Sequence, residues 1–571
     1  MVKNKFRDMP KFNNIKGILL NSVKLYPNNI AFTTKVQKDK KVEYIEKTYS
    51  EFLEDINCFG TALYNLGLKD KRIAVIGRNR YEWAVAHLSN LLGGMVSVPL
   101  DKELQIEELE NSLVRSEVEA IVFDEKYTEN IEQIVKNGKT NIKYYICMSK
   151  HSEYKNIYDL MQEGKKLISN GDTEYINSEI DSNKMSILLF TSGTTSNAKA
   201  VMLSQIGIAT NVYDMQIVET FLDTDVNIAF VPYHHIFGST GIMVMLASGI
   251  KTVFPDGLKY IKQNLNEYGV SVFIGVPILI EKMYQNIEKE IERQGKTRLI
   301  NIAIKISNLL MKLNIDVRRK LFKQIIDQLG GKMRFIVSGG AALDKDILYK
   351  FKQFGIHIVQ GYGLTETSPV ISAENDIYTK EGSVGIPMKS ASVEVVNKDK
   401  DGIGEIIVKS ISVMLGYYKN EEETNKVLKD GWFYTGDLGY IDDEGFVFVT
   451  GRKKDMIVLK NGKKIFPEEL ETVVNKIEEI EESYVYGMPN KDDENDVKLS
   501  VKIVYDPHIV KEKYNDISED NLREILWNKI KEVNTTLPKY KYIKNMILTK
   551  EPLIKTSTQK IKRNEEIKKC I

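Results

Sequence analysis

The segment LLFTSGTTSNAK (residues 188–199) has the residue types that bind a polyphosphate. An apolar run, expected to be a buried strand, leads into a loop with five hydroxyl side chains and one glycine, and the segment ends at Lys199. Hydroxyls and exposed backbone N–H groups donate hydrogen bonds to phosphate oxygens, and the lysine adds a positive charge. The GxxxxGK[ST] pattern of a Walker A loop is absent. The segment therefore predicts a different phosphate loop, with a plain polar turn as the alternative.

This segment resembles the phosphate-binding signature of the adenylate-forming superfamily, which contains acyl-CoA synthetases, luciferases and peptide-synthetase adenylation domains. That signature usually reads TSGTTGxPKG. Here Ser196 and Ala200 replace glycines and Ala198 replaces the proline, so the loop backbone loses conformational freedom. The hydroxyls and the lysine are kept, which implies that the phosphate contacts are kept. The phosphate-binding residues that the resemblance implies are Thr191, Ser192, Gly193, Thr194, Thr195 and Lys199.

Two downstream segments resemble the elements of this family that bind adenine and magnesium. VSGGAAL (residues 337–343) resembles the adenine-contacting turn, and GYGLTETSP (residues 361–369) resembles the segment that stacks on adenine, contacts phosphate and holds Mg²⁺. An aromatic face suits a base, and a carboxylate oxygen suits a hard cation. The resemblance implies nucleotide contacts from Gly339, Gly340, Ala341, Tyr362, Gly363 and Thr365. It implies that Glu366 and Thr191 bind the metal and take part in catalysis.

VPYHHIFG (residues 231–238) resembles the family segment that places an aromatic or histidine gate beside the acyl pocket. His235 aligns with the gate, with a structural core histidine as the alternative, and the neighbouring His234 has no assigned role. Amino-acid-activating relatives carry an Asp here, whereas this chain has no acidic residue between positions 231 and 250. The substrate-binding residues that the resemblance implies are His235, Gly238, Gly275, Gly339 and Gly340.

The last motifs resemble the ribose-binding, hinge and C-terminal elements. In YTGDLGYIDDEGFVFVTGRKKD (residues 434–455), Asp437 is expected to accept hydrogen bonds from ribose, Arg452 to lie near ribose and phosphate, and Lys454 to be the hinge. Gly462 is expected near the tunnel for the thiol. STQKIKR (residues 557–563) resembles the GKIxR element, which makes Lys560 the adenylation lysine although Gln559 stands where glycine is usual.

The resemblance implies a two-step ligase that uses ATP, Mg²⁺ and coenzyme A. A carboxylate would attack the α-phosphate to give an acyl-adenylate, and the thiol would then displace AMP. A medium- or long-chain fatty acid is expected, because residues 281–329 resemble the helical stretch typical of long-chain members. An aryl acid is the second choice of substrate, and acyl carrier protein is an alternative acceptor. A non-catalytic nucleotide- or acyl-binding relative is the alternative from another functional class.

The elements that must position these residues follow an alternating pattern. KRIAVIG, EAIVFD, KYYICM, NIAFVP, SVFIGVP and MRFIVSGG read as buried strands separated by helical stretches. This alternation predicts an α/β fold with a large N-terminal domain that has mostly parallel sheets. Residues 281–329 are expected to be an amphipathic helical insertion.

The pattern changes after about residue 452. A helix is expected over ETVVNKIEEIEE, followed by the strands SYVYGM and VKLSVKIVY, a helix over 519–537 and the strand YIKNMILTK. These elements predict a small, mobile α+β domain. The expected domains are therefore residues 1–453 and 454–571.

Composition limits the remaining choices. The 571 residues carry 80 basic and 79 acidic side chains, which gives no basic surplus for a nucleic acid. The three cysteines are far apart and no leader pattern is seen, so a cytoplasmic location is expected. Residues 226–250 lack charged side chains but contain Pro232, two histidines and three glycines. A buried strand and helix is expected there and not a transmembrane segment, while contact with a membrane surface is left open.

Overall fold

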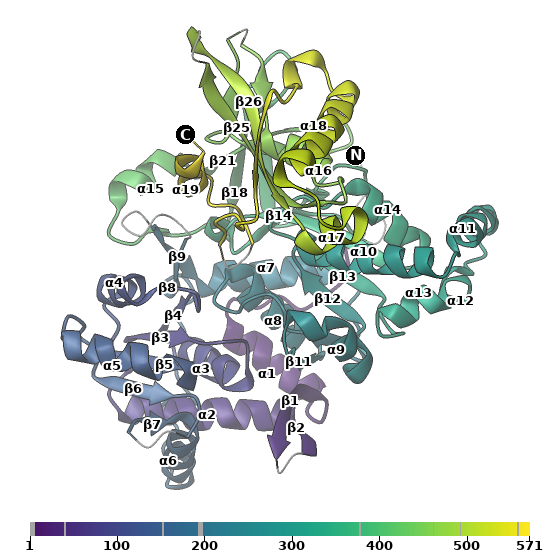
Figure 1. Cartoon of the computed structure of the whole chain (residues 1–571). Coiled ribbons are helices and arrows are strands. Elements are labelled where there is room, and N and C mark those ends of the chain that lie inside the picture. Colours follow the sequence, from purple (N-terminus) through teal and green to yellow (C-terminus); the bar gives the residue numbers. More distant parts are fainter. Residues whose placement is uncertain are drawn as a thin grey trace. The chain divides into compact units, whose positions relative to one another are not determined.

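The computed structural model describes residues 6–38, 41–150, 153–191, 198–375, 378–460, 462–490, 493–556 and 559–570. The chain divides into two compact units. The first contains residues 1–393, 408–434 and 442–447, and the second contains residues 394–407, 435–441 and 448–571. The fold is α/β, with two large, mostly parallel sheets in the first unit (Figure 1). None of the described helices is long and apolar enough to cross a membrane.

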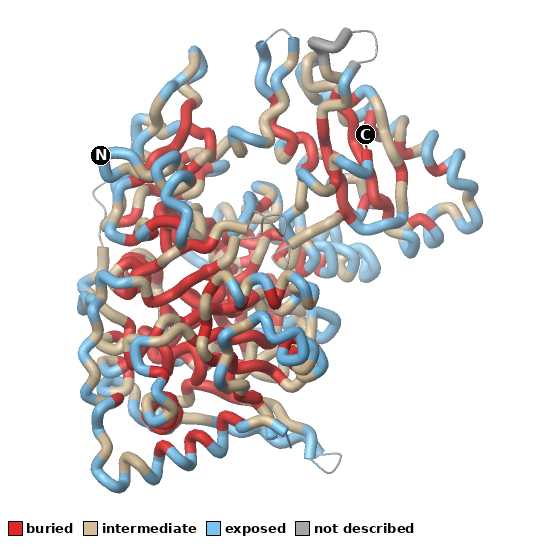
Figure 2. The backbone as a smooth tube through the Cα atoms, turned by 90° about the vertical axis from the view of Figure 1, so that its left-hand side faces the viewer, coloured by how far each residue is buried: buried red, intermediate tan, exposed pale blue. Residues whose placement is uncertain are grey.

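One large sheet has eight strands in the order β19-β9-β8-β4-β3-β5-β6-β7. The neighbours from β8 to β7 run parallel, whereas β9 and β19 are antiparallel. Every residue of β5 is buried, as expected for a strand covered on both faces (buried segments are red in Figure 2). The strands are β3 (Arg72–Ile76), β4 (Val96–Leu100), β5 (Ala120–Phe123), β6 (Tyr144–Cys147), β7 (Lys155–Asn156), β8 (Met185–Phe190), β9 (Ala200–Ser204) and β19 (Gly416–Tyr417). Helix α2 (Tyr49–Asn65) precedes β3, and the helices between the strands are α3 (Tyr81–Leu92), α4 (Ile106–Ser116), α5 (Thr128–Asn137) and α6 (Ile157–Ser169).

The other large sheet has nine strands in the order β16-β15-β14-β13-β12-β10-β11-β1-β2, and its neighbours from β14 to β1 run parallel. Its strands are β1 (Ile30–Lys38), β2 (Lys41–Thr48), β10 (Val226–Ile228), β11 (Lys251–Val253), β12 (Val272–Gly275), β13 (Phe335–Ser338), β14 (His357–Gly363), β15 (Val370–Ala373) and β16 (Ile386–Pro387). Its helices are α1 (Ile15–Leu25), α7 (Gln205–Val218), α8 (Ile236–Ala247), α9 (Ile261–Tyr268), α10 (Pro277–Arg293), α11 (Thr297–Lys312), α12 (Arg318–Leu321), α13 (Lys323–Gln328) and α14 (Lys345–Gln353).

These elements confirm the six strands that the sequence predicts in the N-terminal part, as β3, β5, β6, β10, β12 and β13. The charge-free stretch over residues 226–250 is β10 followed by the buried helix α8, as expected. A five-stranded sheet follows in the order β17-β18-β21-β20, with β22 paired to β21. Its elements are β17 (Ala391–Val396), β18 (Gly404–Ser410), α15 (Glu421–Val427), β20 (Leu428–Lys429), β21 (Trp432–Ile441) and β22 (Val447–Arg452).

The C-terminal part of the second unit is α+β. A three-stranded sheet, β25-β26-β27, packs with helices around its own apolar core. The elements are β23 (Ile457–Val458), β24 (Lys464–Ile465), α16 (Pro467–Val474), β25 (Ile480–Asn490), β26 (Asp493–Tyr505), α17 (Pro507–Tyr514), α18 (Glu519–Thr536), β27 (Asn545–Thr549) and α19 (Arg563–Glu566).

The helix expected over residues 471–482 is wrong after Val474, where α16 ends, so most of the expected range is not helical. Tertiary contacts explain the early end. The Glu479 carboxylate is fully buried and accepts hydrogen bonds from Lys529 and Tyr514. The next residue, Ile480, already pairs with Tyr505 in the sheet. These contacts outweigh the local helical pattern.

Candidate active site

The two ends of the expected phosphate loop are held together by a β-hairpin. Strand β8 pairs antiparallel with β9, and Phe190 lies opposite Ala200. The next residue inward, Thr191, donates from its backbone N to the Lys199 carbonyl at 2.9 Å and from its Oγ1 to the same oxygen at 3.3 Å. Ser192, Gly193, Thr194 and Thr195 lie outside the described residues, as does Ser196.

The lysine of this loop is engaged by two residues from a distant part of the chain. Lys199 Nζ lies 2.7 Å from Glu423 Oε2 and 4.5 Å from the centre of the Tyr417 ring. The hydrogen bond from Lys199 is the main cause that lowers the pKa of Glu423 to about 2. The side chains of Lys199 and Glu423 are about one third exposed, so the pair is accessible to an incoming anion.

The same tyrosine also binds the carboxylate expected to hold the metal. The Tyr417 hydroxyl donates to Glu366 Oε1 at 2.9 Å, and the Met414 backbone N donates to the Glu366 carbonyl at 2.8 Å. Glu366 lies in the short helix η3 (Thr365–Thr367), and Tyr417 lies in β19 beside β9. The phosphate-loop lysine and the expected metal carboxylate are therefore joined through one buried tyrosine.

The side chains present here are compatible with magnesium. Among the described residues, no cluster of three or more His, Cys, Asp or Glu side chains could hold a metal ion. Mg²⁺ does not need such a cluster, because it is commonly bound by one or two carboxylates together with waters and substrate phosphates. Glu366 with the Thr191 hydroxyl fits that pattern.

The glycine turn after β13 packs closely against the start of α8. The Gly339 backbone N donates to the Gly275 carbonyl at 3.2 Å. A Cβ atom at Gly339 would lie 2.9 Å from the Phe237 ring, so a larger residue would push that ring away. Gly340 has a φ of +88°, a conformation that favours glycine. Ala341 follows on the exposed surface.

The segment that carries Tyr362 is built around a tight backbone contact. Tyr362 pairs with Ser372 across β14 and β15. A Cβ atom at Gly363 would lie 1.8 Å from the Pro369 carbonyl oxygen, so only glycine fits. Helix η3 begins two residues later at Thr365. The geometry explains Gly363 structurally, while the adenine contacts of this segment stay a prediction.

The expected acyl-pocket residues lie at and near the start of α8. His235 is the residue before the helix, and the neighbouring His234 places its Nε2 3.1 Å from Asp101 Oδ1. A Cβ atom at Gly238 would lie 2.1 Å from the Pro232 carbonyl, and one at Gly275 would lie 2.3 Å from the Phe273 ring. These glycines therefore permit close packing, and their contact with an acyl chain stays a prediction.

The second unit holds the expected ribose and hinge residues. Arg452 Nε lies 3.0 Å from Asp437 Oδ1, and Asp437 is buried. The Asp437 backbone N donates a hydrogen bond to Thr435 Oγ1 at 3.0 Å. Lys454 is exposed, and Gly462 has a φ of +75° with open space where a Cβ would stand.

Lys560 lies in an exposed turn near the C-terminus. The Thr556 backbone N donates to the Lys560 carbonyl at 2.8 Å, and the Gln559 N donates to the Thr556 carbonyl at 2.8 Å. Gln559 has a φ of +64°, which explains why glycine is usual at this position in the family motif. Beyond the turn, Arg563 Nη2 binds Glu471 Oε2 at 2.6 Å and fixes the segment against α16.

Within the first unit, described hydrogen bonds and packing contacts connect the phosphate loop, Glu366, the glycine turn and α8. Thr240 Oγ1 in α8 donates to the Ser368 carbonyl at 3.5 Å, which connects α8 to the segment of Glu366. Asp437, Arg452, Lys454, Gly462 and Lys560 belong to the second unit. Their part in one common site is a proposal.

Sequence reasoning missed Tyr417 and Glu423. Tyr417 lies 51 residues from Glu366 and more than 200 from Lys199, and no local pattern links them. The pairing of β19 with β9 brings the tyrosine to the phosphate loop.

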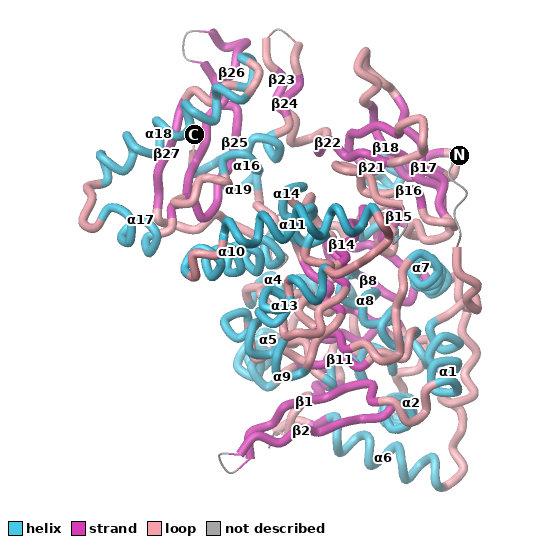
Figure 3. Tube along the Cα trace, turned by 90° about the vertical axis from the view of Figure 1, so that its right-hand side faces the viewer, coloured by secondary structure: helices cyan, strands magenta, loops and turns pink. Residues whose placement is uncertain are grey.

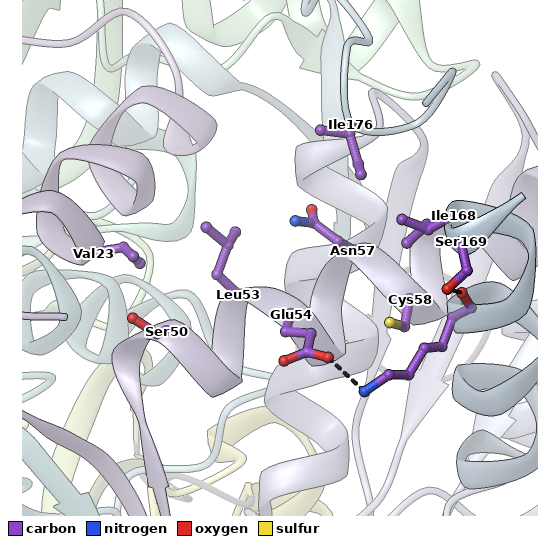
Figure 4. Close-up of a pocket in the computed structure, with 10 residues that line it drawn as sticks. Val23, Ser50, Leu53, Glu54, Asn57, Cys58, Ile168, Ser169 and Ile176 are labelled. Atoms are coloured by element: carbon purple, nitrogen blue, oxygen red, sulfur yellow. Dashed lines mark hydrogen bonds and ion pairs between the residues drawn. The ribbon is translucent and has the colours of Figure 1, made fainter. Parts of the chain in front are cut away.

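A separate pocket of about 440 Å³ lies beside α1, α2 and α6 (Figure 4). A Lys165–Glu54 ion pair of 2.8 Å lies at this pocket. Its lining residues are Val23, Ser50, Leu53, Glu54, Asn57, Cys58, Lys165, Ile168, Ser169 and Ile176. None of the residues predicted for the active site lines it.

Comparison with known protein families matches both parts of the chain. A family model described as AMP-binding enzyme matches residues 19–418. A second, described as AMP-binding enzyme C-terminal domain, matches residues 454–570.

Individual relatives are distant. The chain is 28% identical over 483 residues to fatty acyl-CoA synthetase B of Dictyostelium discoideum, covering 79% of this chain and 71% of that protein. It is 28% identical over 478 residues to long-chain-fatty-acid–CoA ligase 5 of Rattus norvegicus, covering 77% and 69%. It is 26% identical over 561 residues to a chloroplastic long-chain-fatty-acid–[acyl-carrier-protein] ligase of Arabidopsis thaliana, covering 86% and 76%.

Solved structures share the fold. An anthranilate CoA ligase in complex with anthranoyl-AMP superposes with a TM-score of 0.77 at 18% identity, covering 99% of this chain and 98% of that one. An o-succinylbenzoate CoA synthetase from Bacillus subtilis, in complex with ATP and magnesium ion, superposes with a TM-score of 0.70 at 21% identity, covering 96% and 99%. At these identities the structures show the fold alone.

Proposed function

This chain belongs to the AMP-binding enzyme family, and we propose that it is an ATP-dependent ligase that joins a medium- or long-chain fatty acid to coenzyme A. The observation that supports this most is the cluster of Lys199, Tyr417 and Glu366 at the phosphate loop. Adenylation needs a cation that binds phosphate and a carboxylate that binds Mg²⁺. Lys199 and Glu366 would supply them, and both contact Tyr417.

In the first half-reaction the acid's carboxylate oxygen attacks the α-phosphate of ATP, and pyrophosphate leaves. Thr191 and the loop hydroxyls would donate to the phosphates, and Lys199 would exchange its Glu423 partner for phosphate oxygens. Magnesium, when held by Glu366 and Thr191, supplies charge neutralisation on the phosphates. Lys560 would orient the acid oxygen and the α-phosphate through its charge, without taking a proton.

In the second half-reaction the thiol attacks the acyl carbonyl and AMP leaves. We assign the hinge to Lys454, an exposed residue that lies in a turn. Rotation there would withdraw Lys560 and bring the Gly462 turn to the thiol, a domain motion of a known kind. Asp437 would hold the ribose, and its ion pair with Arg452 keeps both side chains in place.

The acid is proposed from charge and from relatives. Residues 231–250, which include helix α8, carry no acidic side chain that could pair with the amine of an amino acid. One relative is named a fatty acyl-CoA synthetase and another a long-chain-fatty-acid–CoA ligase, which supports a fatty acid. An aryl acid is the second candidate, because a structure of the same fold holds anthranoyl-AMP.

Coenzyme A is proposed as the acceptor because the named relatives include CoA ligases. Acyl carrier protein is the alternative, since one relative is named for it. A cytoplasmic location is part of the proposal, because Cys58, Cys147 and Cys570 are free thiols.

A non-catalytic relative is the competing class. It would not need Lys199, Glu366, Asp437, Arg452 and Lys560, all of which are present. Acid-dependent ATP–pyrophosphate exchange separates the two classes. Exchange should appear with C8 or C16 acids and stay at background with acetate, benzoate or an amino-acid mixture, and AMP release should then require coenzyme A. A folded protein with no exchange for any acid would reject ligase activity.

A further inference from the structure

Helix α11 (Thr297–Lys312) exposes an apolar stripe that the proposed reaction does not use. Five side chains are between 50% and 65% exposed and recur at helical spacing. At 3.6 residues per turn they fall within about 80° of the helix circumference. The stripe consists of Leu299, Ile302, Ile306 and Leu309, with Leu313 directly after the helix.

A different face of the same helix attaches it to the first unit. Ile300, Ala303 and Ile304 pack against the core cluster formed around α10, α13 and β13. The stripe is therefore not the core-facing side of an amphipathic helix, because α11 has a second apolar face. Figures 1 and 3 agree that α11 lies at the surface of the first unit, beside α10 and α13.

Basic residues run along one edge of the stripe. Arg298, Lys305 and Lys312 recur every seven residues, and helical geometry places them within about 60° of the stripe. No acidic residue lies within α11. Between positions 293 and 323 the chain has nine Lys or Arg and one Asp, whereas the whole chain has a net charge of only +1.

We infer that α11 is an interfacial helix that binds the surface of an anionic lipid membrane. Long basic side chains beside an apolar stripe can reach lipid phosphates while the stripe enters the acyl boundary. The helix has 16 residues, too few to span a bilayer, which takes about 20. A lipid surface needs only an apolar stripe with basic residues beside it, and α11 carries both.

The test is vesicle flotation of the full chain, which needs no turnover and is independent of the proposed reaction. The wild type should float with vesicles in which about a third of the lipid is phosphatidylglycerol, and salt should weaken the binding. It should float poorly with phosphatidylcholine alone. Replacing Arg298, Lys305 and Lys312 by Gln should weaken binding on the order of 100-fold. The matched control replaces Lys24, Lys136 and Lys166, exposed lysines of other helices, by Gln.

The stripe has its own variant and control. Ile302→Gln with Ile306→Gln and Leu309→Gln should abolish flotation, whereas Leu20→Gln with Leu25→Gln, at exposed leucines of α1, should not. Thermal unfolding confirms that all variants fold. A wild type that stays off anionic vesicles, or a stripe variant that binds like the wild type, would overturn the inference. The inference would also be overturned if the wild type formed a dimer and the stripe variant did not, since a second copy of the chain would then cover the stripe.

Discussion

The contact between Tyr417 and Glu366 gives the sharpest prediction about metal binding. Tyr417→Phe removes only the hydroxyl that donates to Glu366 Oε1 at 2.9 Å and keeps the ring beside Lys199. A hydrogen bond to a charged group contributes about 1.5–3 kcal/mol. At about 1.4 kcal/mol per tenfold change, its loss should raise the Mg²⁺ concentration for half-maximal ATP–pyrophosphate exchange by roughly 10- to 100-fold.

The adjacent residue offers a matched control. The Tyr418 hydroxyl donates to Glu117 Oε2 at 2.7 Å, so Tyr418→Phe removes the same group from a glutamate outside the site. Both variants should lose similar stability, but only Tyr417→Phe should shift the Mg²⁺ titration. An unchanged titration for Tyr417→Phe, or an equal shift in both variants, would refute the assignment of Glu366 to the metal.

Two further predictions concern packing and pH. Gly363→Ala should destabilise the protein by about 1–3 kcal/mol or more, because its Cβ would lie 1.8 Å from the Pro369 carbonyl oxygen. Gly361→Ala is the control. The nearest atom to a Cβ there is 3.6 Å away, so this change should cost little stability. Thermal unfolding of both variants decides this. Burial raises the pKa of Glu374 from 4.5 to about 7. The raised value means that its contribution to stability is full below pH 4.5 and is lost as pH rises through about 7. Glu374→Gln should therefore remove about 2–3 kcal/mol of pH dependence over that interval. Denaturant titrations at pH 5 and pH 8 measure the free energy of unfolding at each pH. The same difference between the two pH values in the variant and the wild type would contradict the prediction.

Local sequence patterns predicted more of the fold than of the candidate site. Buried strands such as β3 and β5 have continuous apolar sequences, so they could be predicted without tertiary information. The early end of α16 could not, because it depends on the buried carboxylate of Glu479 and its partners from α17 and α18. Local sequence does not encode such long-range contacts.

The site shows the same limit. The motif residues Thr191, Lys199 and Glu366 could be proposed from local patterns, since each lies in a segment with a recognisable order of residue types. Tyr417 and Glu423 could not, because strand pairing and α15 bring them to the loop from more than 200 residues away. Gly363 was predicted as a nucleotide contact. The structure shows that packing against Pro369 requires glycine at this position whether or not a nucleotide binds.

Lys560 is proposed to serve adenylation and not thioester formation. Lys560→Ala should lower acid-dependent ATP–pyrophosphate exchange on the order of 10²- to 10³-fold or more, because it removes the positive charge that would stabilise the negative charge developing on the α-phosphate. Thioester formation from supplied acyl-AMP and coenzyme A should stay close to that of the wild type. Lys568→Ala, at an exposed lysine of the same terminal segment, should change neither half-reaction. Equal loss of both half-reactions in Lys560→Ala, or full exchange without the lysine, would contradict the account.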